Sequence, residues 1–361
     1  MPDRRSARQA AVLNALPAQG ADALLVTHLP NVRWLTGFSG SAALLLLTAD
    51  RASLITDFRY AGQAPEEAGS VAEVIIERAS VWDRLQRVLR DVAFETLAIE
   101  SHVLSVRDAE RVRGMFRGRT LPMADTVEQF RQVKDDDEVA AIRAAGTLAS
   151  EALAEILPTI HAGERELDVA SRLEAALRRR GSEWHPFQTI VASGPRAAHP
   201  HARSSPRQLA RGELLLIDYG AQVGGYCADV TRTVALGEVD ERQRAVYQLV
   251  CDAQRRACLG LRSGMSGREG DALARDLISS RGYGDAFGHS LGHGLGLEVH
   301  EAPRLAATAE AALPAGAVVT VEPGIYLAGW GGVRLEDDVW LGPDGPVLLT
   351  DGQTELIILD A

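Results

Sequence analysis

Two segments that combine apolar strands, a glycine-containing turn and acidic side chains restrict the fold more than any other feature. The first, ELLLIDYGAQVGGYCADVTRTVAL, covers residues 213–236, and the second, AVVTVEPGIYLAGWGGVRLEDDVWL, covers residues 317–341. Apolar runs on both sides of a glycine turn predict β-hairpins. A carboxylate inside such an apolar strand is costly to bury unless a cation compensates it. The chain is therefore expected to fold around two acidic hairpins.

The first hairpin places two aspartates close together. If Gly224 and Gly225 form a two-residue turn, Asp218 lies opposite Thr231 on the neighbouring strand. Because side chains alternate along a strand, Asp218 and Asp229 then point to the same face as diagonal neighbours. Two converging carboxylates in an apolar strand pair repel each other and therefore need a cation. The alternative is that both lie on the solvated face of an edge hairpin.

The second hairpin repeats this arrangement with glutamates. Glu322 and Glu336 flank the turn AGWGG, and each is embedded in apolar strand residues. Their separation of fourteen residues keeps them on one face, provided that no bulge intervenes. Two hairpins that each contribute a carboxylate pair indicate a shared site.

A histidine-rich segment, GHSLGHGLGLEVHEAP at residues 288–303, lies between the hairpins and carries His289, His293 and His300. Its four glycines make a regular helix unfavourable, which argues against an H-E-x-x-H zinc helix. A G-x-G-x-x-G phosphate loop does not fit either, because position 297 is leucine. Glycines allow close backbone approach to a crowded site. One histidine can bind a metal while the others contact substrate, although a single histidine is more often structural.

The combined ligand set consists of four carboxylates and one imidazole. Such hard ligands suit Mn²⁺, with Co²⁺ or Zn²⁺ as alternatives, better than an ion that prefers thiolates. Four carboxylates over-neutralise one ion, so we expect two metals about 3.5 Å apart. Two bridged metals can share a water, lower its pKa and polarise a carbonyl group, which permits hydrolysis without a protein nucleophile.

The length of 361 residues suggests about two domains. Strands and helices alternate over the first part of the chain, which predicts a small α/β domain with a loop at residues 30–41. The remainder predicts an α+β domain of antiparallel hairpins backed by helices. We place the boundary near residues 122–134 and divide the chain into domains 1–125 and 126–361. The expected helices of the second domain cover residues 136–160, 164–180, 240–262 and 267–280.

Charge and composition exclude some partners. The net charge of −11 argues against nucleic acid or an anionic membrane as the main partner. The N-terminal segment lacks the apolar core of a signal peptide, and the longest apolar run, around SAALLLLTA, is too short to span a membrane. Three cysteines without a C-x-x-C pair are typical of a reducing compartment. We therefore expect a cytoplasmic protein.

Several motifs resemble those of a known family. IDYGAQVGGYCADVTRT, GHSLGHGLGLEVHE, VEPGIY and VRLEDD resemble the metal-binding motifs of the pita-bread metallopeptidases. NVRWLTGFSGS resembles the N-terminal domain shared by creatinase, prolidase and Xaa-Pro aminopeptidase, and TIVASGPRAAHPHA is similar to their segment with another active-site histidine. The resemblance covers nearly the whole chain in the correct order. It implies an α+β pita-bread catalytic domain preceded by a smaller α/β creatinase-like N-terminal domain.

The resemblance also implies roles for individual residues. The two divalent metal ions would be held by Asp218, Asp229, His293, Glu322 and Glu336, with Asp229 and Glu336 bridging the ions.

Substrate contacts follow from the same motifs. His300 would hydrogen-bond the substrate carbonyl or the tetrahedral intermediate, and His289 would help to position the substrate. His201 would contact the proline side, with His199 as the alternative candidate. Arg334 would orient the substrate or support the metal ligands. Tyr326 would support the pocket.

The implied reaction is attack of a metal-bridging hydroxide on the carbonyl preceding proline, with Glu322 passing the proton to the leaving nitrogen. The resemblance favours a homodimeric Xaa-Pro dipeptidase acting on proline-containing peptides, and an Xaa-Pro aminopeptidase acting on longer peptides is the alternative. A methionine aminopeptidase usually lacks the large N-terminal domain. A metal-free creatinase-like hydrolase or a non-catalytic binding protein is expected to have lost ligands, whereas all five positions are intact here.

Overall fold

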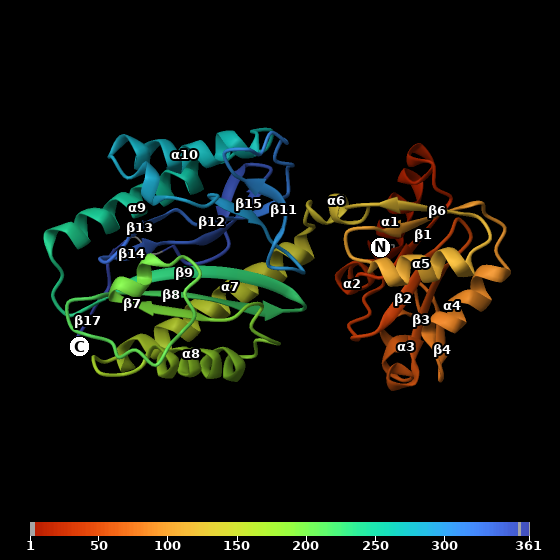
Figure 1. Ribbon diagram of the computed structural model, residues 1–361, viewed down its shortest axis with the longest axis horizontal. Coiled ribbons are helices and arrows are strands. Elements are labelled where there is room, and N and C mark those ends of the chain that lie inside the picture. Colours follow the sequence, from red (N-terminus) through yellow and green to blue (C-terminus); the bar gives the residue numbers. More distant parts are fainter. Residues whose placement is uncertain (1–3, 353–354, 361) are drawn as a thin grey trace. The chain divides into compact units, whose positions relative to one another are not determined.

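The computed structural model describes residues 4–352 and 355–360 (Figure 1). The chain divides into two compact units, Met1–Arg131 and Gln132–Ala361, which we call the N-terminal unit and the C-terminal unit. No helix among the described residues is both long and apolar enough to cross a membrane. Cys227, Cys251 and Cys258 are free thiols, and all three are buried.

The N-terminal unit is built on one six-stranded mixed sheet in the order β4-β3-β2-β1-β5-β6. Strands β1, β5 and β6 run parallel to one another, and β1, β2 and β3 form an antiparallel meander. The strands are β1 Ala23–Val26, β2 Ala43–Leu47, β3 Ala52–Asp57, β4 Glu73–Glu77, β5 Thr96–Glu100 and β6 Arg119–Met123. The helices are α1 Arg4–Ala15, α2 Leu29–Thr36, α3 Gln63–Ala68, α4 Val81–Arg90, α5 Val106–Met115 and α6 Glu128–Arg131. This arrangement confirms the predicted α/β class.

The prediction of a loop at residues 30–41 is wrong for its first half. Residues 29–36 form helix α2, whose first turn contains Pro30. Proline is tolerated there because the first helical N–H groups have no intrahelical partner. Gly37, with φ of 81°, ends the helix in the left-handed conformation that favours glycine. The sequence analysis did not recognise Pro30 as a helix start or Gly37 as a helix end, because both residue types are also common in loops.

The C-terminal unit contains three antiparallel or mixed sheets between two pairs of helices (Figure 1). The sheets have the orders β17-β9-β8-β7, β11-β10-β12-β15-β16 and β13-β14. The strands are β7 Ile190–Ser193, β8 Leu214–Val223, β9 Tyr226–Leu236, β10 Gly292–Gly294, β11 Glu301–Leu305, β12 Val318–Val321, β13 Gly324–Leu327, β14 Gly331–Arg334, β15 Asp337–Gly342, β16 Gly345–Leu348 and β17 Ile358–Leu359. Helices α7 Asp136–Ile156, α8 Glu166–Arg180, α9 Glu241–Gly260 and α10 Gly267–Ser280 confirm the four predicted helices.

Two cores hold the helix pairs against the sheets. Helices α7 and α8 pack on the face of β8 that carries Leu215, Ile217 and Tyr219. Helices α9 and α10 form a second core with residues of β12, β13, β14 and β15. The opposite face of the β8–β9 hairpin therefore points into the space between the layers.

The first predicted hairpin is confirmed in its register. Asp218 pairs with Thr231 and Gly220 pairs with Asp229, so the two aspartates are diagonal neighbours on one face. Gly224 and Gly225 have φ values of 59° and 83° and form the two-residue turn.

The second predicted hairpin is interrupted at its two glutamates. Val321 pairs with Asp337 in the β12–β15 ladder, and Gly324 pairs with Arg334 in the β13–β14 ladder. The two ladders thus keep the same register across the break. Glu322 and Glu336 lie in that break, opposite each other in register and outside either ladder.

Candidate metal centre and active site

The aspartates project from the face of the β8–β9 hairpin that the helices α7 and α8 leave free. Leu215, Ile217 and Tyr219 point toward these helices, so the alternation of side chains turns Asp218 to the other face. Asp218 and Asp229 are both buried. The edge-hairpin alternative, in which both carboxylates face solvent, is therefore wrong.

The break in the second hairpin connects the glutamates to other segments. The backbone N–H of Glu322 donates to the carbonyl of Leu291 at 2.8 Å, in the histidine-rich segment. The backbone N–H of Glu336 donates to the carbonyl of Thr231 at 3.1 Å, on β9. These two bonds bring both acidic hairpins and the histidine-rich segment to one place.

His293 lies on β10 with its ring held in one orientation. Its Nδ1 is 3.0 Å from the carbonyl oxygen of Gly294, and because a carbonyl only accepts, Nδ1 carries the proton. The free Nε2 faces Glu322 Oε1 at 3.5 Å and Asp229 Oδ2 at 3.9 Å. Ligand atoms of Asp229, His293 and Glu336 all lie within 4.8 Å of one another. Burial lowers the pKa of His293 to about 4, which keeps the ring in the neutral form that binds metals.

Two glycines of the histidine-rich segment allow this close packing. A Cβ at Gly292 would lie 1.9 Å from the carbonyl oxygen of Thr320, and one at Gly294 would lie 2.2 Å from that of Ala302. Gly288 has no atom within 4 Å of such a position. The predicted close approach of the backbone is confirmed at the two glycines that flank His293.

The pKa shifts of the buried carboxylates indicate whether this site suits cations. Burial raises the pKa of Asp229 well above its ordinary value, and repulsion from Glu336 and Asp218 adds to this. Burial and Glu336 likewise raise the pKa of Glu322, and burial with Asp218 raises that of Glu336 to about 8. The buried Oδ1 of Asp218 has no hydrogen-bond partner. Oxygen-rich donors that repel one another and leave an oxygen unsatisfied fit divalent cations.

Arg334 connects the carboxylates to the pocket side chains. Its Nη2 donates to Asp218 Oδ2 at 2.6 Å, and its Nε donates to Thr231 Oγ1 at 3.1 Å. Thr231 in turn donates to Glu336 Oε2 at 2.6 Å. The Nη1 of Arg334 donates to the hydroxyl of Tyr326 at 2.9 Å. The guanidinium is thus fixed within the ligand set.

Tyr326 and His289 continue this chain. His289 Nδ1 lies 2.8 Å from the carbonyl oxygen of Ser290 and therefore carries the proton. His289 Nε2 then accepts from the Tyr326 hydroxyl at 2.9 Å. Burial lowers the pKa of His289 to about 4, so its ring is neutral at pH 7.

The other predicted histidines differ in their positions. His300 is exposed, and its ring lies 4.3 Å from the ring of His293. His201 is also exposed, and a positive charge on its ring would lower the pKa values of Asp218, His289 and His300. The backbone N–H of His199 donates to the carbonyl of Arg196, and the His199 side chain is exposed. The structure thus places His201 near Asp218, one of the predicted metal ligands.

Some supporting residues were missed by the sequence analysis. Asp338 Oδ2 accepts from the backbone N–H of Asp229 at 3.1 Å, which fixes the strand at that aspartate. Asp271 and Arg275 on α10 hold the backbone around His289. Their i,i+4 spacing was the only signal for this pair, and such spacing is common on helix surfaces.

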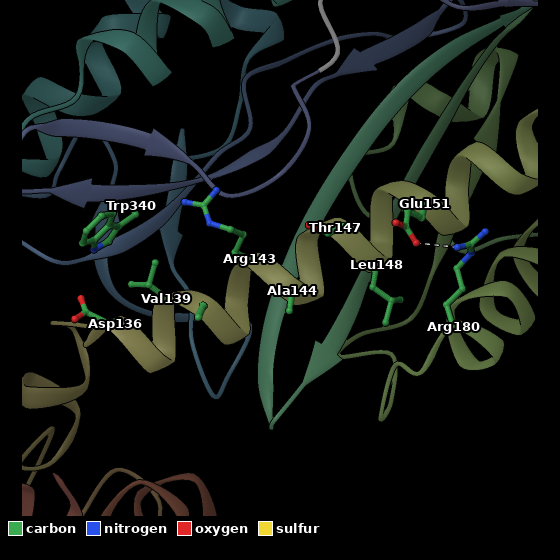
Figure 2. A pocket seen from close by; sticks show the side chains of 10 residues that line it. Asp136, Val139, Arg143, Ala144, Thr147, Leu148, Glu151, Arg180 and Trp340 are labelled. Carbon is green, nitrogen blue, oxygen red and sulfur yellow. Dashed lines mark hydrogen bonds and ion pairs between the residues drawn. The ribbon is translucent and has the colours of Figure 1, made fainter. Parts of the chain in front are cut away.

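The hollow shown in Figure 2 is lined by residues outside the candidate metal centre. It has a volume of about 610 Å³ and follows α7 between Trp340 and Arg180, where Glu151 pairs with Arg180 at 2.8 Å. None of the predicted site residues lines it. We therefore place the candidate active site at the carboxylate cluster around His293 and not in this hollow.

Comparison with known proteins shows which family the chain is similar to. The profile of metallopeptidase family M24 matches residues 140–343, and that of the creatinase/prolidase N-terminal domain matches residues 8–133. A Xaa-Pro dipeptidase of Pyrococcus horikoshii is 34% identical over 348 residues, which cover 96% of this chain and 97% of the relative.

Solved structures of two kinds are similar to the whole chain. A Xaa-Pro dipeptidase from Bacillus anthracis has a TM-score of 0.94 and 36% identity, covering 99% of both chains. An X-Pro aminopeptidase from Thermotoga maritima has a TM-score of 0.90 and 36% identity, covering 97% of this chain and 99% of that chain. These similarities confirm the family resemblance and the expected fold.

Proposed function

The chain belongs to metallopeptidase family M24, and from that premise we propose that it hydrolyses the bond preceding proline in Xaa-Pro dipeptides. The observation that carries this proposal is the buried set of carboxylates around His293, with one aspartate oxygen left unsatisfied. Two divalent ions, preferably Mn²⁺, would be held by Asp218, Asp229, His293, Glu322 and Glu336. When bound, the ions supply Lewis acidity and an activated water.

The protein side chains have separate tasks in this proposal. His300, exposed beside His293, donates a hydrogen bond to the oxygen that becomes negative as the carbonyl is attacked. Glu322 takes up a proton at its carboxylate and passes it to the leaving proline nitrogen. Arg334 and Tyr326 fix Asp218 and His289, so that the pocket keeps its shape during turnover.

The dipeptidase activity is proposed over the aminopeptidase alternative because positively charged or donor groups are needed to recognise the proline carboxylate. His201 is exposed near Asp218 and can provide such a donor. Arg334 is less suited to this task because Asp218 already occupies its guanidinium. We further propose a homodimer in the cytoplasm, in line with the reduced, buried cysteines.

Cleavage of Xaa-Pro and Xaa-Pro-Xaa peptides by the Mn²⁺-loaded protein tests this proposal. We expect efficient turnover of the dipeptide and at least tenfold lower kcat/KM for the tripeptide. Equal or better turnover of tripeptides would establish the aminopeptidase alternative. No cleavage of either peptide with Mn²⁺, Co²⁺ or Zn²⁺ would refute the Xaa-Pro specificity.

A variant links this activity to the ligand set. Asp229→Asn should abolish both metal loading and peptide cleavage, because it removes a proposed metal-binding carboxylate. The exposed Asp276 on α10 offers a matched control, and Asp276→Asn should retain both properties. Full activity of Asp229→Asn would show that the metals lie elsewhere.

A further inference from the structure

A second group of ligand-type side chains lies at one edge of the N-terminal sheet. Strands β1, β5 and β6 are parallel neighbours, so their carboxyl ends meet at the same edge. His28 follows β1, His102 follows β5, and Glu128 begins α6 after β6. In open α/β sheets, ligands bind in the crevice beyond the carboxyl ends of the strands. The topology thus delivers two imidazoles and a carboxylate to a place suited to a ligand.

The distances within this group fit one metal ion. His28 Nδ1 lies 3.4 Å from Glu128 Oε1, and His102 Nε2 lies 2.9 Å from the same oxygen. The ligand atoms of all three residues lie within 4.8 Å of one another. Tetrahedral zinc with bonds of about 2.0–2.2 Å places neighbouring ligand atoms about 3.3 Å apart. The first distance already matches, and the second requires an opening of a few tenths of an ångström.

We propose that His28, His102 and Glu128 form a binding site for a single Zn²⁺ ion, distinct from the M24 metal centre. Two imidazoles and one carboxylate are ligands that zinc accepts, with a water completing the coordination. The side chains of His28, His102 and Glu128 are 18%, 28% and 17% exposed, which leaves the site accessible to an ion from solvent.

Neighbouring side chains hold the ligands in place, as outer partners do in metal sites. Asn31 Nδ2 donates to Glu128 Oε1 at 2.6 Å, and Arg131 Nη1 donates to Asn31 Oδ1 at 2.7 Å. Glu100 Oε2 accepts from the backbone N–H of His28 at 2.8 Å, which fixes the start of α2. Burial opposes ionisation of Glu128, but hydrogen bonds from His28, Asn31 and His102 lower its pKa below the ordinary value. Glu128 is thus a carboxylate at neutral pH.

The competing explanation is a metal-free hydrogen bond between His102 and Glu128. It accounts for the 2.9 Å distance, since one proton can be shared between these two atoms. Under this explanation His28, His102 and Asn31 must all hydrogen-bond the same carboxylate, with donor atoms 3.4, 2.9 and 2.6 Å from one oxygen of Glu128. A cation bound between these side chains would be ligated by the lone pairs of both imidazole rings. The two explanations predict different amounts of zinc bound per chain.

The experiment counts zinc in the full-length protein. Wild type, His28→Ala, His102→Ala and the control His161→Ala, which changes an exposed histidine of the C-terminal unit, are loaded with Zn²⁺, desalted and analysed by mass spectrometry. We expect wild type and His161→Ala to hold one zinc per chain more than either site variant. Titration against a chelator should show that each site variant binds that ion at least about 100-fold more weakly than wild type does. This loss is larger than the effect of losing an outer partner.

A second measurement separates loss of the site from loss of the fold. Circular dichroism of the chelator-treated variants should match that of chelator-treated wild type. In the chain with Asp229→Asn and His293→Ala, Zn²⁺ should still raise the unfolding midpoint, and His102→Ala should remove this rise. Equal zinc content in wild type and both site variants, or an equal loss in His161→Ala, would overturn the proposal. Because the count does not depend on peptide cleavage, it stands apart from the proposed peptidase activity.

Discussion

At the scale of single residues, the orientation of His289 depends on two side chains outside the pocket. On α10, Arg275 Nη1 donates to the carbonyl of Phe287 at 2.8 Å, and its Nη2 donates to that of His289 at 2.6 Å. Asp271 Oδ1 accepts from the backbone N–H of Leu291 at 3.0 Å and also from Arg275 Nη2 at 2.9 Å. The pair thereby holds the backbone on both sides of His289.

We expect Arg275→Lys to lower kcat/KM by about tenfold, the lower end of what the loss of an outer partner costs. A lysine ammonium cannot reproduce the planar set of donors that reaches two carbonyls and a carboxylate together. Steady-state kinetics on an Xaa-Pro dipeptide would measure this loss. Arg268→Lys, at an exposed position of the same helix, is the control and should leave kcat/KM unchanged. Equal kinetics of both variants would contradict a positioning role for Arg275.

The three thiols should be inert in the native protein. Burial raises the pKa of Cys227 to about 12, and it also raises the pKa values of Cys251 and Cys258. Because the thiolate is the reactive form, a disulfide reagent at pH 8 should modify none of them in native protein and all three after denaturation. Rapid modification of one thiol in native protein would show that its segment opens readily.

At the scale of elements, strand β10 requires glycine where it packs against β12. In Gly292→Ala, the added Cβ would meet the Thr320 carbonyl oxygen at 1.9 Å, and backbone must move because this contact is not with a flexible side chain. We expect a loss of about 3 kcal/mol in the free energy of unfolding, together with weaker metal binding by the displaced His293. Denaturant unfolding and metal titration would measure the two effects.

Gly288→Ala is the matched control within the same segment. A Cβ at Gly288 meets no atom within 4 Å, so this variant should unfold within about 0.5 kcal/mol of wild type. If both variants unfold alike, the strand is more tolerant than its spacing indicates.

The elements that could be predicted from sequence are those determined by local signals. The turn at Gly224 and Gly225 sets the register of the first hairpin by itself, and the four long helices follow from their apolar periodicity. Helix α2 was missed because Pro30 and Gly37 also occur in loops. The break at Glu322 and Glu336 was missed, and there the backbone N–H groups bond to the distant Leu291 and Thr231.

The residues of the candidate site also divide into those with a local sequence signal and those linked only by long-range contacts. Carboxylates inside apolar strands are visible in the sequence because their burial needs compensation. The ion pair of Arg334 with Asp218 and the bond between Tyr326 and His289 join residues 116 and 37 positions apart. No local pattern encodes such contacts. Pattern predicted that the carboxylates converge, the family resemblance added Arg334, Tyr326 and His289, and the structure adds how these side chains hold one another.

At the scale of the whole molecule, the two units have separate hydrophobic cores. The core of the N-terminal unit joins Leu85 of α4 and Val112 of α5 to Leu25, Leu97 and Ile99 of the sheet. A unit of this size can bury enough apolar surface to be stable without the rest of the chain. The fragment of residues 1–131 should therefore unfold cooperatively in urea.

Amide resonances of this fragment should be dispersed as in a folded domain, and circular dichroism should show both helix and sheet. A fragment that lacks a cooperative transition would show that the N-terminal unit depends on the C-terminal unit for its stability.

The shared register of the two ladders around Glu322 and Glu336 has a consequence for how this fold tolerates changes in length. An extra residue in the turn at 328–330 would enlarge the loop and leave every strand pair as it is. An extra residue at 322 or 323 would put the β12–β15 and β13–β14 ladders out of step and turn one glutamate away from its partner. Insertions and deletions should therefore accumulate at the tip of this hairpin, while the number of residues between the break and each ladder stays constant.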